Sequence, residues 1–326
     1  MYVDPKCAQD GQTYTNMCQY EQMVCSTGND VYILKNGSCE AFSYKHGRIP
    51  VNLDTTVYKC TTVQFGHTFQ TNKTTHIYLT IDFHNSTQSL PHNTVSAWVE
   101  DVTTTSFSAC VLKTGRNDVL PDDGGLAFVN FAAYQGSPPN AVTGEEVIDS
   151  WWEGTTCKLV NFPQGKFLST PYAVVTVKHT IKGLQHDAAT IWLEDLNADS
   201  FRVCLRELLS FDSLHQGLQI NWVAFAVLPE SVEGESHKIS FANNRTPIAG
   251  NTYCEAFSFS GDYVAIPTIL LSAVHHNGPG GLVPDYNSVS AWVEKMNATD
   301  CSICVRQHHK QTGGYDPLTV SVMILG

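Results

Sequence analysis

The sequence predicts a mainly β protein in which three tandem antiparallel β-sandwiches follow a small disulfide-rich segment. One segment pattern recurs three times along the chain. The recurring units contain alternating β-branched and aromatic residues broken by Gly, Pro, Asn and Asp, and helical periodicity is nearly absent. We expect the small segment at residues 1–39 and the repeats at residues 40–140, 141–232 and 233–326.

Composition excludes several classes of protein. The chain has 326 residues, more than one domain usually holds, with 31 acidic and 19 basic residues and a net charge of -12. Such a surface repels phosphate, so nucleic-acid binding is not expected. The apolar runs have strand length, which predicts no membrane span.

Eleven cysteines and five Asn-X-Ser/Thr sequons indicate a secreted, extracellular protein that forms disulfides. The first residues show neither the charged nor the apolar part of a signal peptide, so we expect a fragment or a mature form. We expect N-glycans at most of the sequons, which begin at Asn36, Asn72, Asn85, Asn244 and Asn297.

The repeats share a fixed spacing of Trp and Cys. In each repeat a Trp precedes a Cys by twelve residues, and a further Cys lies upstream at positions that recur every 97 residues. This register predicts one disulfide in each repeat, Cys60–Cys110, Cys157–Cys204 and Cys254–Cys304. Cys301 stands where the other repeats have Phe107 and Phe201, so it is either buried and inert or cross-linked to another chain.

Period-two alternation and apolar runs locate the secondary structure. A short helix is expected near residues 16–25. Strands are expected at residues 75–83, 95–102, 106–112, 126–134, 173–179, 218–228, 268–274 and 318–325.

The Trp strand has two distinct faces. Val95, Ala97 and Val99 lie on one side, which we take as the core, and Trp98 and Glu100 lie on the other. The outward Trp either contacts a partner or is covered by its own repeat. The candidate interface residues are Trp98, Trp192 and Trp292.

The N-terminal residues Cys7-Ala-Gln-Asp-Gly-Gln-Thr-Tyr-Thr-Asn-Met-Cys18, with Cys25 and Gly37-Ser-Cys39, resemble the second half of a Kazal domain. The resemblance implies a Cys7–Cys39 bridge, and it implies that Cys18 and Cys25 pair with cysteines upstream of Met1. Kazal domains are known as serine-protease inhibitors, but their protease-binding loop lies between the second and third cysteines. Inhibition would therefore need a complete upstream Kazal domain.

The second repeat resembles an H-type lectin domain through Phe162, Pro171, the strand at 174–177, the Trp192 strand, Ser200-Phe201-Arg-Val-Cys204 and Asn221-Trp222-Val-Ala. The other two repeats resemble it more weakly. The likeness implies six-stranded antiparallel sandwiches that trimerise and bind N-acetylgalactosamine or galactose at subunit boundaries.

The sugar-binding residues of that family are mostly missing here. The family's Arg falls near Thr94, Ala188 and Ser288, and its Trp-His pair falls near Thr114-Gly115, Leu208-Leu209 and His308-His309. Only the third repeat keeps a remnant, so the candidate carbohydrate-binding residues are Arg306, His308, His309 and Tyr315. A changed site elsewhere on the loops is the alternative.

Catalysis, metal binding and a cofactor are not expected. Neighbouring residues on a strand point to opposite faces, so His275-His276, His308-His309 and Glu100-Asp101 do not converge. No nucleophile elbow, zinc-helix motif or phosphate loop occurs in the sequence.

Two functions remain after these exclusions. One is a secreted glycoprotein that binds carbohydrate or extracellular proteins without catalysis. The other is a structural or adhesive subunit of an extracellular assembly, which would self-associate, with Cys301 as the candidate disulfide link between chains. For the repeats, an extended row is favoured over a compact pseudo-trimer, because the connectors at 134–156 and 229–253 permit both and linked domains move independently by default.

Overall fold

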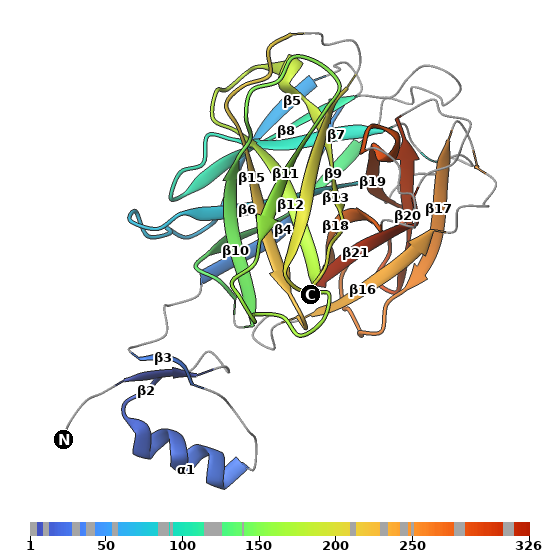
Figure 1. Cartoon of the computed structure of the whole chain (residues 1–326). Helices are drawn as coiled ribbons and strands as arrows, with labels where there is room; N and C mark the ends of the chain where they lie inside the picture. Colours follow the sequence, from blue (N-terminus) through green and yellow to red (C-terminus); the bar gives the residue numbers. More distant parts are fainter. Residues whose placement is uncertain are drawn as a thin grey trace.

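The computed structural model describes residues 5–8, 13–27, 33–36, 43–53, 58–83, 91, 94–113, 126–138, 140–208, 213–228, 234–241, 247–248, 251–276, 284–308 and 316–326. The chain is mainly β, as the sequence predicts, with three six-stranded sheets and one small sheet (Figure 1). In the described part of the chain, no helix combines the length and the apolar character that a membrane span requires.

The N-terminal unit is a small sheet with one helix. Strands β1 (Lys6–Ala8), β2 (Thr13–Tyr14) and β3 (Ile33–Asn36) pair in the order β2-β1-β3. Helix α1 (Met17–Thr27) begins after Asn16, whose side-chain oxygen accepts a hydrogen bond from the Gln19 amide at 3.0 Å. This is the N-cap arrangement that favours Asn at a helix start. The helix expected at residues 16–25 is therefore present.

Each of the three repeats contributes six strands to the body. The first holds β4 (Ser43–Asn52), β5 (Tyr58–Gln64), β6 (Thr75–Phe83), β7 (Val95–Glu100), β8 (Ser106–Lys113) and β9 (Leu126–Gln135). The second holds β10 (Ala141–Val147), β11 (Thr155–Asn161), β12 (Tyr172–His179), β13 (Ala189–Glu194), β14 (Ser200–Glu207) and β15 (Leu218–Phe225). The third holds β16 (Gly234–Phe241), β17 (Thr252–Ser258), β18 (Thr268–His275), β19 (Val289–Glu294), β20 (Asp300–Gln307) and β21 (Leu318–Leu325).

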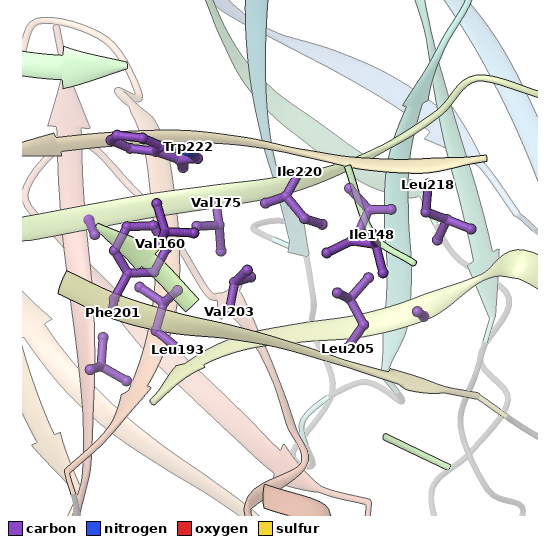
Figure 2. Packing of buried hydrophobic residues seen from close by; sticks show 14 of the residues in the cluster. Ile148, Val160, Val175, Leu193, Phe201, Val203, Leu205, Leu218, Ile220 and Trp222 are labelled. Atoms are coloured by element: carbon purple, nitrogen blue, oxygen red, sulfur yellow. The ribbon is translucent and has the colours of Figure 1, made fainter. Parts of the chain in front are cut away.

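Within each repeat the strands form two antiparallel three-stranded sheets. In the second repeat these are β10-β15-β12 and β11-β14-β13. Ile148, Val160, Val175, Phe201 and Ile220 belong to the apolar core that these sheets share (Figure 2). Alternating apolar residues on facing strands produce this core, as in other antiparallel sandwiches.

Neighbouring repeats share their sheets, because one strand of each pairs in parallel with a strand of the next. β7 of the first repeat pairs with β12 of the second, β13 of the second with β18 of the third, and β19 of the third with β6 of the first. The expected extended row is therefore wrong. Pairing closes the three repeats into a ring with pseudo-threefold symmetry.

Buried hydroxyl groups reinforce this ring. The Leu79 amide donates to Thr176 Oγ1 of the second repeat at 2.9 Å. The Val175 amide donates to Ser272 Oγ, and the Leu271 amide donates to Thr80 Oγ1, both also at 2.9 Å. These hydroxyls recur at intervals of 96 residues, so each repeat supplies one acceptor to its neighbour.

An apolar core common to all three repeats explains the compact arrangement. It contains Tyr78 and Tyr134 of the first repeat, Val174 and Phe225 of the second and Leu270 of the third, among others. Strands β6 and β18 are buried along their whole length, since one face lies in their own sandwich and the other lies between repeats. A large apolar interface prevents the independent motion expected of flexibly linked domains.

Candidate functional site at the boundaries between repeats

The three parallel strand pairs define three boundaries. The first lies between repeats one and two, the second between repeats two and three, and the third between repeats three and one. At each boundary a Trp and a Glu two residues later share one strand face. The indole Nε1 donates to the carboxylate Oε1 at 2.8 Å for Trp98–Glu100, 2.6 Å for Trp192–Glu194 and 2.9 Å for Trp292–Glu294.

These tryptophans are buried at contacts between repeats. Trp98 belongs to the core of the second repeat, Trp192 to that of the third and Trp292 to that of the first. The second disulfide-bonded Cys of each repeat packs in the same neighbouring core as the Trp. These residues are Cys110, Cys204 and Cys304. The face opposite the repeat's own core therefore serves the neighbouring repeat and is not exposed to solvent.

A turn with a left-handed residue ends each Trp strand. Asp101, Asp195 and Lys295 directly follow the boundary glutamates and have φ angles of 50°, 56° and 50°. Few non-glycine residues adopt this region, and Asp tolerates it better than Lys does. Strand β7 therefore ends at Glu100, two residues before the end expected from its apolar pattern.

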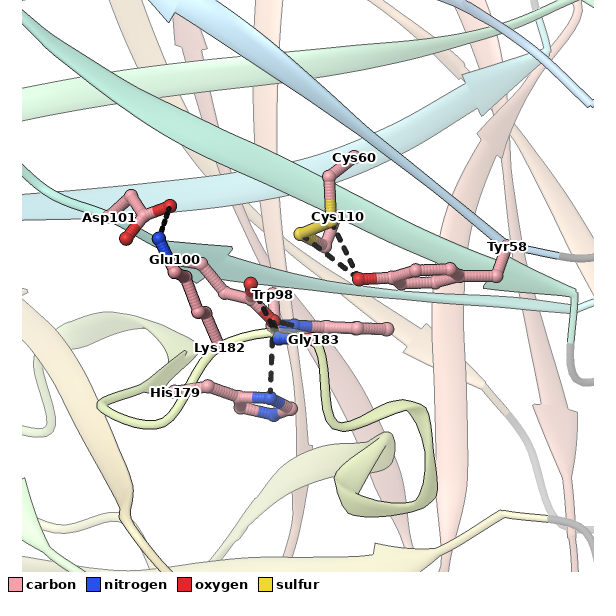
Figure 3. Close-up of a disulfide and its surroundings, with 9 residues drawn as sticks. All are labelled: Tyr58, Cys60, Trp98, Glu100, Asp101, Cys110, His179, Lys182 and Gly183. Atoms are coloured by element: carbon pink, nitrogen blue, oxygen red, sulfur yellow. Dashed lines mark hydrogen bonds and ion pairs between the residues drawn. A yellow bond between two sulfur atoms is a disulfide. The ribbon is translucent and has the colours of Figure 1, made fainter.

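At the first boundary the Trp98 ring lies between two other rings. Tyr58 stacks on it at 5.7 Å, and His179 of the second repeat stacks on it at 4.9 Å (Figure 3). The Glu100 carboxylate accepts the Gly183 amide at 3.1 Å and lies 3.7 Å from His179 Nδ1. Burial lowers the pKa of His179 to about 4, so this imidazole is neutral at neutral pH.

The second boundary holds a denser polar cluster. Glu194 pairs in register with His275, and Asn287 Nδ2 donates to the Glu194 carboxylate at 3.3 Å and to that of Asp316 at 2.9 Å. Burial raises the pKa of Glu194 to about 7, although hydrogen bonds from Trp192 and Asn287 oppose this effect. Burial also lowers the pKa of His275 to about 4.

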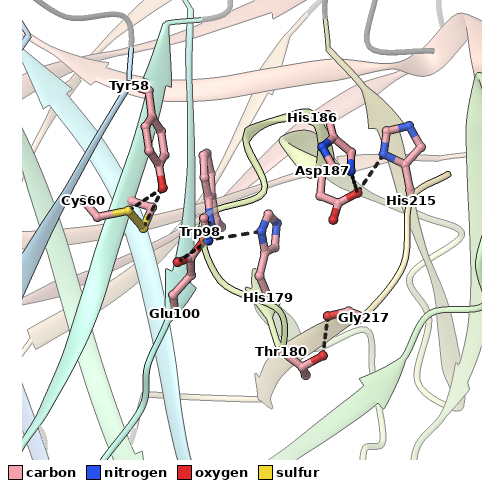
Figure 4. A network of polar contacts seen from close by, with 12 residues as sticks. Tyr58, Cys60, Trp98, Glu100, His179, Thr180, His186, Asp187, His215 and Gly217 are labelled. Atoms are coloured by element: carbon pink, nitrogen blue, oxygen red, sulfur yellow. Dashed lines mark hydrogen bonds and ion pairs between the residues drawn. A yellow bond between two sulfur atoms is a disulfide. The ribbon is translucent and has the colours of Figure 1, made fainter. Parts of the chain in front are cut away.

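A buried histidine in the second repeat lies between two carboxylates. His215 Nδ1 is 3.2 Å from Asp187 Oδ1 (Figure 4). On the other side of the ring, His215 Nε2 is 3.1 Å from Glu207 Oε2. Its ring stacks on Trp151 at 4.6 Å. Glu207 Oε1 accepts the Gly154 amide at 2.7 Å, so both oxygens of Glu207 are held.

Glu207 also lines an open pocket of about 520 Å³ where the second repeat meets the third. Arg206 Nη1 donates to Thr155 Oγ1 at 3.1 Å and to Asp285 Oδ1 of the third repeat at 3.0 Å. Trp152, which directly precedes the lining residue Glu153 in the chain, is 67% exposed. The complete lining is Glu153, Gly154, Thr155, Arg206, Glu207, Asp285 and Tyr286.

The carbohydrate-binding residues expected in the third repeat are not in such a pocket. Arg306 and His308 are buried, and His308 Nε2 lies 2.7 Å from Ser290 Oγ. His309 and Tyr315 lie outside the described residues. Burial disfavours contact of Arg306 and His308 with a sugar, and their assignment as carbohydrate-binding residues stays a prediction.

Sequence reasoning missed Trp152, Arg206, Glu207, Asp285 and Tyr286. One signal was available, because Trp151-Trp152-Glu153 has no counterpart five residues before Cys60 or Cys254. The Arg206–Asp285 contact had no signal, since it joins residues of different repeats that are 79 positions apart.

The cysteines divide into cross-strand pairs and others. Cys60–Cys110, Cys157–Cys204 and Cys254–Cys304 are disulfides between directly opposed residues of adjacent strands. Cys301 is buried, and burial raises the pKa of its thiol to about 12; both features disfavour a cross-link to another chain through Cys301, which stays a prediction.

In the N-terminal unit, Cys18 and Cys25 are exposed on α1. Cys39 lies outside the described residues, so the implied Cys7–Cys39 bridge does too.

One group of potential metal ligands occurs in the described residues. Cys60, Cys110 and Glu100 bring their ligand atoms within 4.8 Å of one another. The two sulfurs are bonded to each other and therefore cannot act as thiolate ligands.

The sequons are placed in part. Asn72 and Asn297 are exposed in turns, whereas Asn85 and Asn244 lie outside the described residues. Asn36 ends strand β3. The exposed pair meets the access requirement for glycosylation.

Comparison with known families identifies the N-terminal unit. Residues 2–39 match the Kazal-type serine protease inhibitor domain. Neither the comparison with curated proteins nor that with solved structures gave a match. A Kazal domain and disulfides both fit an extracellular protein. The chain thus carries a Kazal-like N-terminal segment in front of three β-sandwich repeats.

Proposed function

We propose that this chain is a secreted, non-catalytic protein that binds glycans in the pocket at the second boundary. The observation that carries the proposal is the composition of this pocket, in which charged and hydroxyl side chains of two repeats converge. The exposed Trp152 directly precedes the lining residue Glu153 in the chain. Sugar sites combine an aromatic surface with a few fixed polar groups, because a sugar ring has apolar faces and hydroxyl edges.

The polar groups suit a polyhydroxylated ligand. The Arg206–Asp285 pair and Glu207 offer donors and acceptors whose positions are already held by protein contacts. Hydrogen bonds to charged groups are stronger than neutral ones. Prior ordering reduces the entropy lost on binding.

The charge of the pocket restricts the kind of glycan. Glu153, Glu207 and Asp285 supply three carboxylates, and the single cation, Arg206, already contacts Asp285. Repulsion disfavours sialylated and sulfated sugars. We therefore propose neutral or amino-bearing sugars, including the N-acetylgalactosamine implied by the H-type lectin resemblance.

A glycan array probed with the full chain tests this function. We expect binding to neutral glycans that free N-acetylgalactosamine or galactose competes away. Trp152→Ala and Asp285→Asn should each weaken it about tenfold, the cost of losing roughly 1.4 kcal/mol. Val227→Ser, which changes an apolar residue of the same repeat that is 70% exposed, is the matched control. Absence of binding, or equal binding by all variants, would overturn the proposal.

A second candidate is a subunit of an extracellular assembly. Leu168 and Val264 are fully exposed at positions 96 residues apart in equivalent loops, where the first repeat carries Asn72. Two equivalent apolar tips on one molecule would offer repeated contacts to other copies of the chain. If they join copies of the chain, light scattering should show a larger species that Leu168→Ser with Val264→Ser dissociates. A monomer before and after the changes would remove this candidate.

A further inference from the structure

A buried histidine, His215, contacts Glu207, which lines the pocket at the second boundary. His215 is fully buried and has Asp187 at one ring nitrogen and Glu207 at the other, both within hydrogen-bond distance. A neutral imidazole carries one N–H and can donate to only one carboxylate. Donation to two ionised carboxylates requires the imidazolium form, which this geometry therefore favours.

The surroundings favour the proton on His215. Burial alone lowers the pKa of His215, but hydrogen bonds and charge attraction from Asp187 and Glu207 outweigh it, and the pKa is raised above its ordinary value. His186 Nε2 also faces the cluster, at 3.5 Å from Asp187 Oδ1. His179, with its pKa near 4, stays neutral and adds no charge at neutral pH.

The two carboxylates differ in their freedom to respond. Asp187 is almost completely buried, whereas the Glu207 side chain reaches the pocket and is 11% exposed. When His215 loses its proton, one carboxylate loses a donor. Glu207 is the one that can turn toward solvent, which would change the wall of the pocket.

We propose that His215 is a positioning residue for Glu207, so that ligand affinity in the pocket at the second boundary falls as pH rises through the titration of His215. Protonated His215 holds Glu207 in one orientation, where its carboxylate can accept a ligand hydroxyl. Deprotonation leaves Glu207 held by the Gly154 amide alone, and the ligand must then order its carboxylate at an entropic cost. The inference rests on the proposed function, because it concerns the same pocket.

Linkage requires a reciprocal effect. If protonation of His215 strengthens ligand binding, then the bound ligand must raise the pKa of His215 by the corresponding amount. A structural role for His215 would change stability and would not produce this pH dependence of binding.

The first experiment needs no ligand. In the full chain with isotope-labelled histidine, NMR follows the Cε1–H resonance of His215 from pH 5 to 9, assigned with His215→Gln. We expect a midpoint above 6.5, which Glu207→Gln shifts downward because one of the two carboxylates is lost. A midpoint that Glu207→Gln leaves unchanged overturns the link between His215 and Glu207.

The second experiment measures N-acetylgalactosamine binding by calorimetry between pH 6 and 8.5. We expect affinity to fall about fivefold with rising pH, at the low end of coupling between linked sites. His186→Gln should keep this slope, and His215→Gln should flatten it. If His215→Gln does not fold, the reduced slope of Glu207→Gln replaces it.

The outcomes separate the two proposals. Binding that is equally strong at every pH, or a slope that disappears with His186→Gln, overturns the inference and leaves the glycan pocket standing. Absence of binding at every pH overturns the N-acetylgalactosamine site and any ligand linkage, while the ligand-free titration still decides whether His215 controls Glu207.

Discussion

The second and third boundaries use the same Trp–Glu pair in different surroundings. At the second, Glu194 lies in register with His275 and within a polar cluster that includes Asn287. At the third, Glu294 lies in register with Phe83. The repeated pair serves the closure of the ring at both places, whereas titratable neighbours that could respond to pH occur where a histidine replaces the phenylalanine.

The largest effect is expected when the Trp that the two boundaries have in common is removed. Trp192→Ala and Trp292→Ala should each lower the free energy of unfolding by about 4 kcal/mol, because a fully buried indole leaves a cavity in the neighbouring repeat. Guanidinium unfolding of the full chain measures both. Trp152→Ala, which removes an exposed indole, should cost less than about 0.5 kcal/mol.

Equal costs at the two boundaries would show that the pair has one structural role. A cost near zero for either variant would contradict the assignment of these tryptophans to the ring contacts.

The second test uses acid. His179 and His275 have folded-state pKa values of about 4, below the ordinary 6.5, so the unfolded chain binds more protons between these values. Stability should therefore fall as pH drops from 6.5 to 4, by up to about 3 kcal/mol for each histidine. Glu194, with its pKa raised to about 7, acts in the opposite sense and costs stability as pH rises from 4.5 to 7.

Exchanging the residues that pair with the boundary glutamates, His275 and Phe83, shows whether the histidine causes the acid loss. His275→Phe should reduce the acid loss to that of His179, although the variant also loses the hydrogen bond to the Asp316 carbonyl. Phe83→His should add an acid loss at the third boundary. Denaturation midpoints at pH 7, 6, 5 and 4 decide between these outcomes, and an unchanged acid slope in His275→Phe would show that the histidine is not its source.

The smallest expected effect concerns the buried hydroxyl groups that accept hydrogen bonds from the neighbouring repeat. Thr176→Val should lower the free energy of unfolding by about 2 kcal/mol, because it leaves the buried Leu79 amide without its acceptor. Thr176→Ser retains the hydroxyl and should cost clearly less. Equal losses in the two variants would assign the effect to packing and not to the hydrogen bond between repeats.

The local elements could largely be predicted from the sequence. Strand β6 has the bounds expected from its apolar run, since a strand of this length with β-branched and aromatic residues needs no tertiary information to be located. The end of β7 was predicted too late, because Val102 continues the apolar pattern while Asp101 turns the chain.

The candidate site was predicted less well. Family resemblance pointed to Arg306 and His308, but residue type and spacing do not reveal that both are buried. The pocket instead depends on Arg206 and Asp285, which come from different repeats and meet only when the ring closes.

The sequence by itself determined the three repeats and their cross-strand disulfides, because a shared register places equivalent cysteines opposite each other in equivalent sandwiches. Only the tertiary structure decided between a ring and a row. The connectors allow both, and the choice depends on parallel strand pairing, buried hydroxyls and an apolar core shared by three repeats. The strand pairings join residues that lie 79 to 211 positions apart, where local periodicity carries no information.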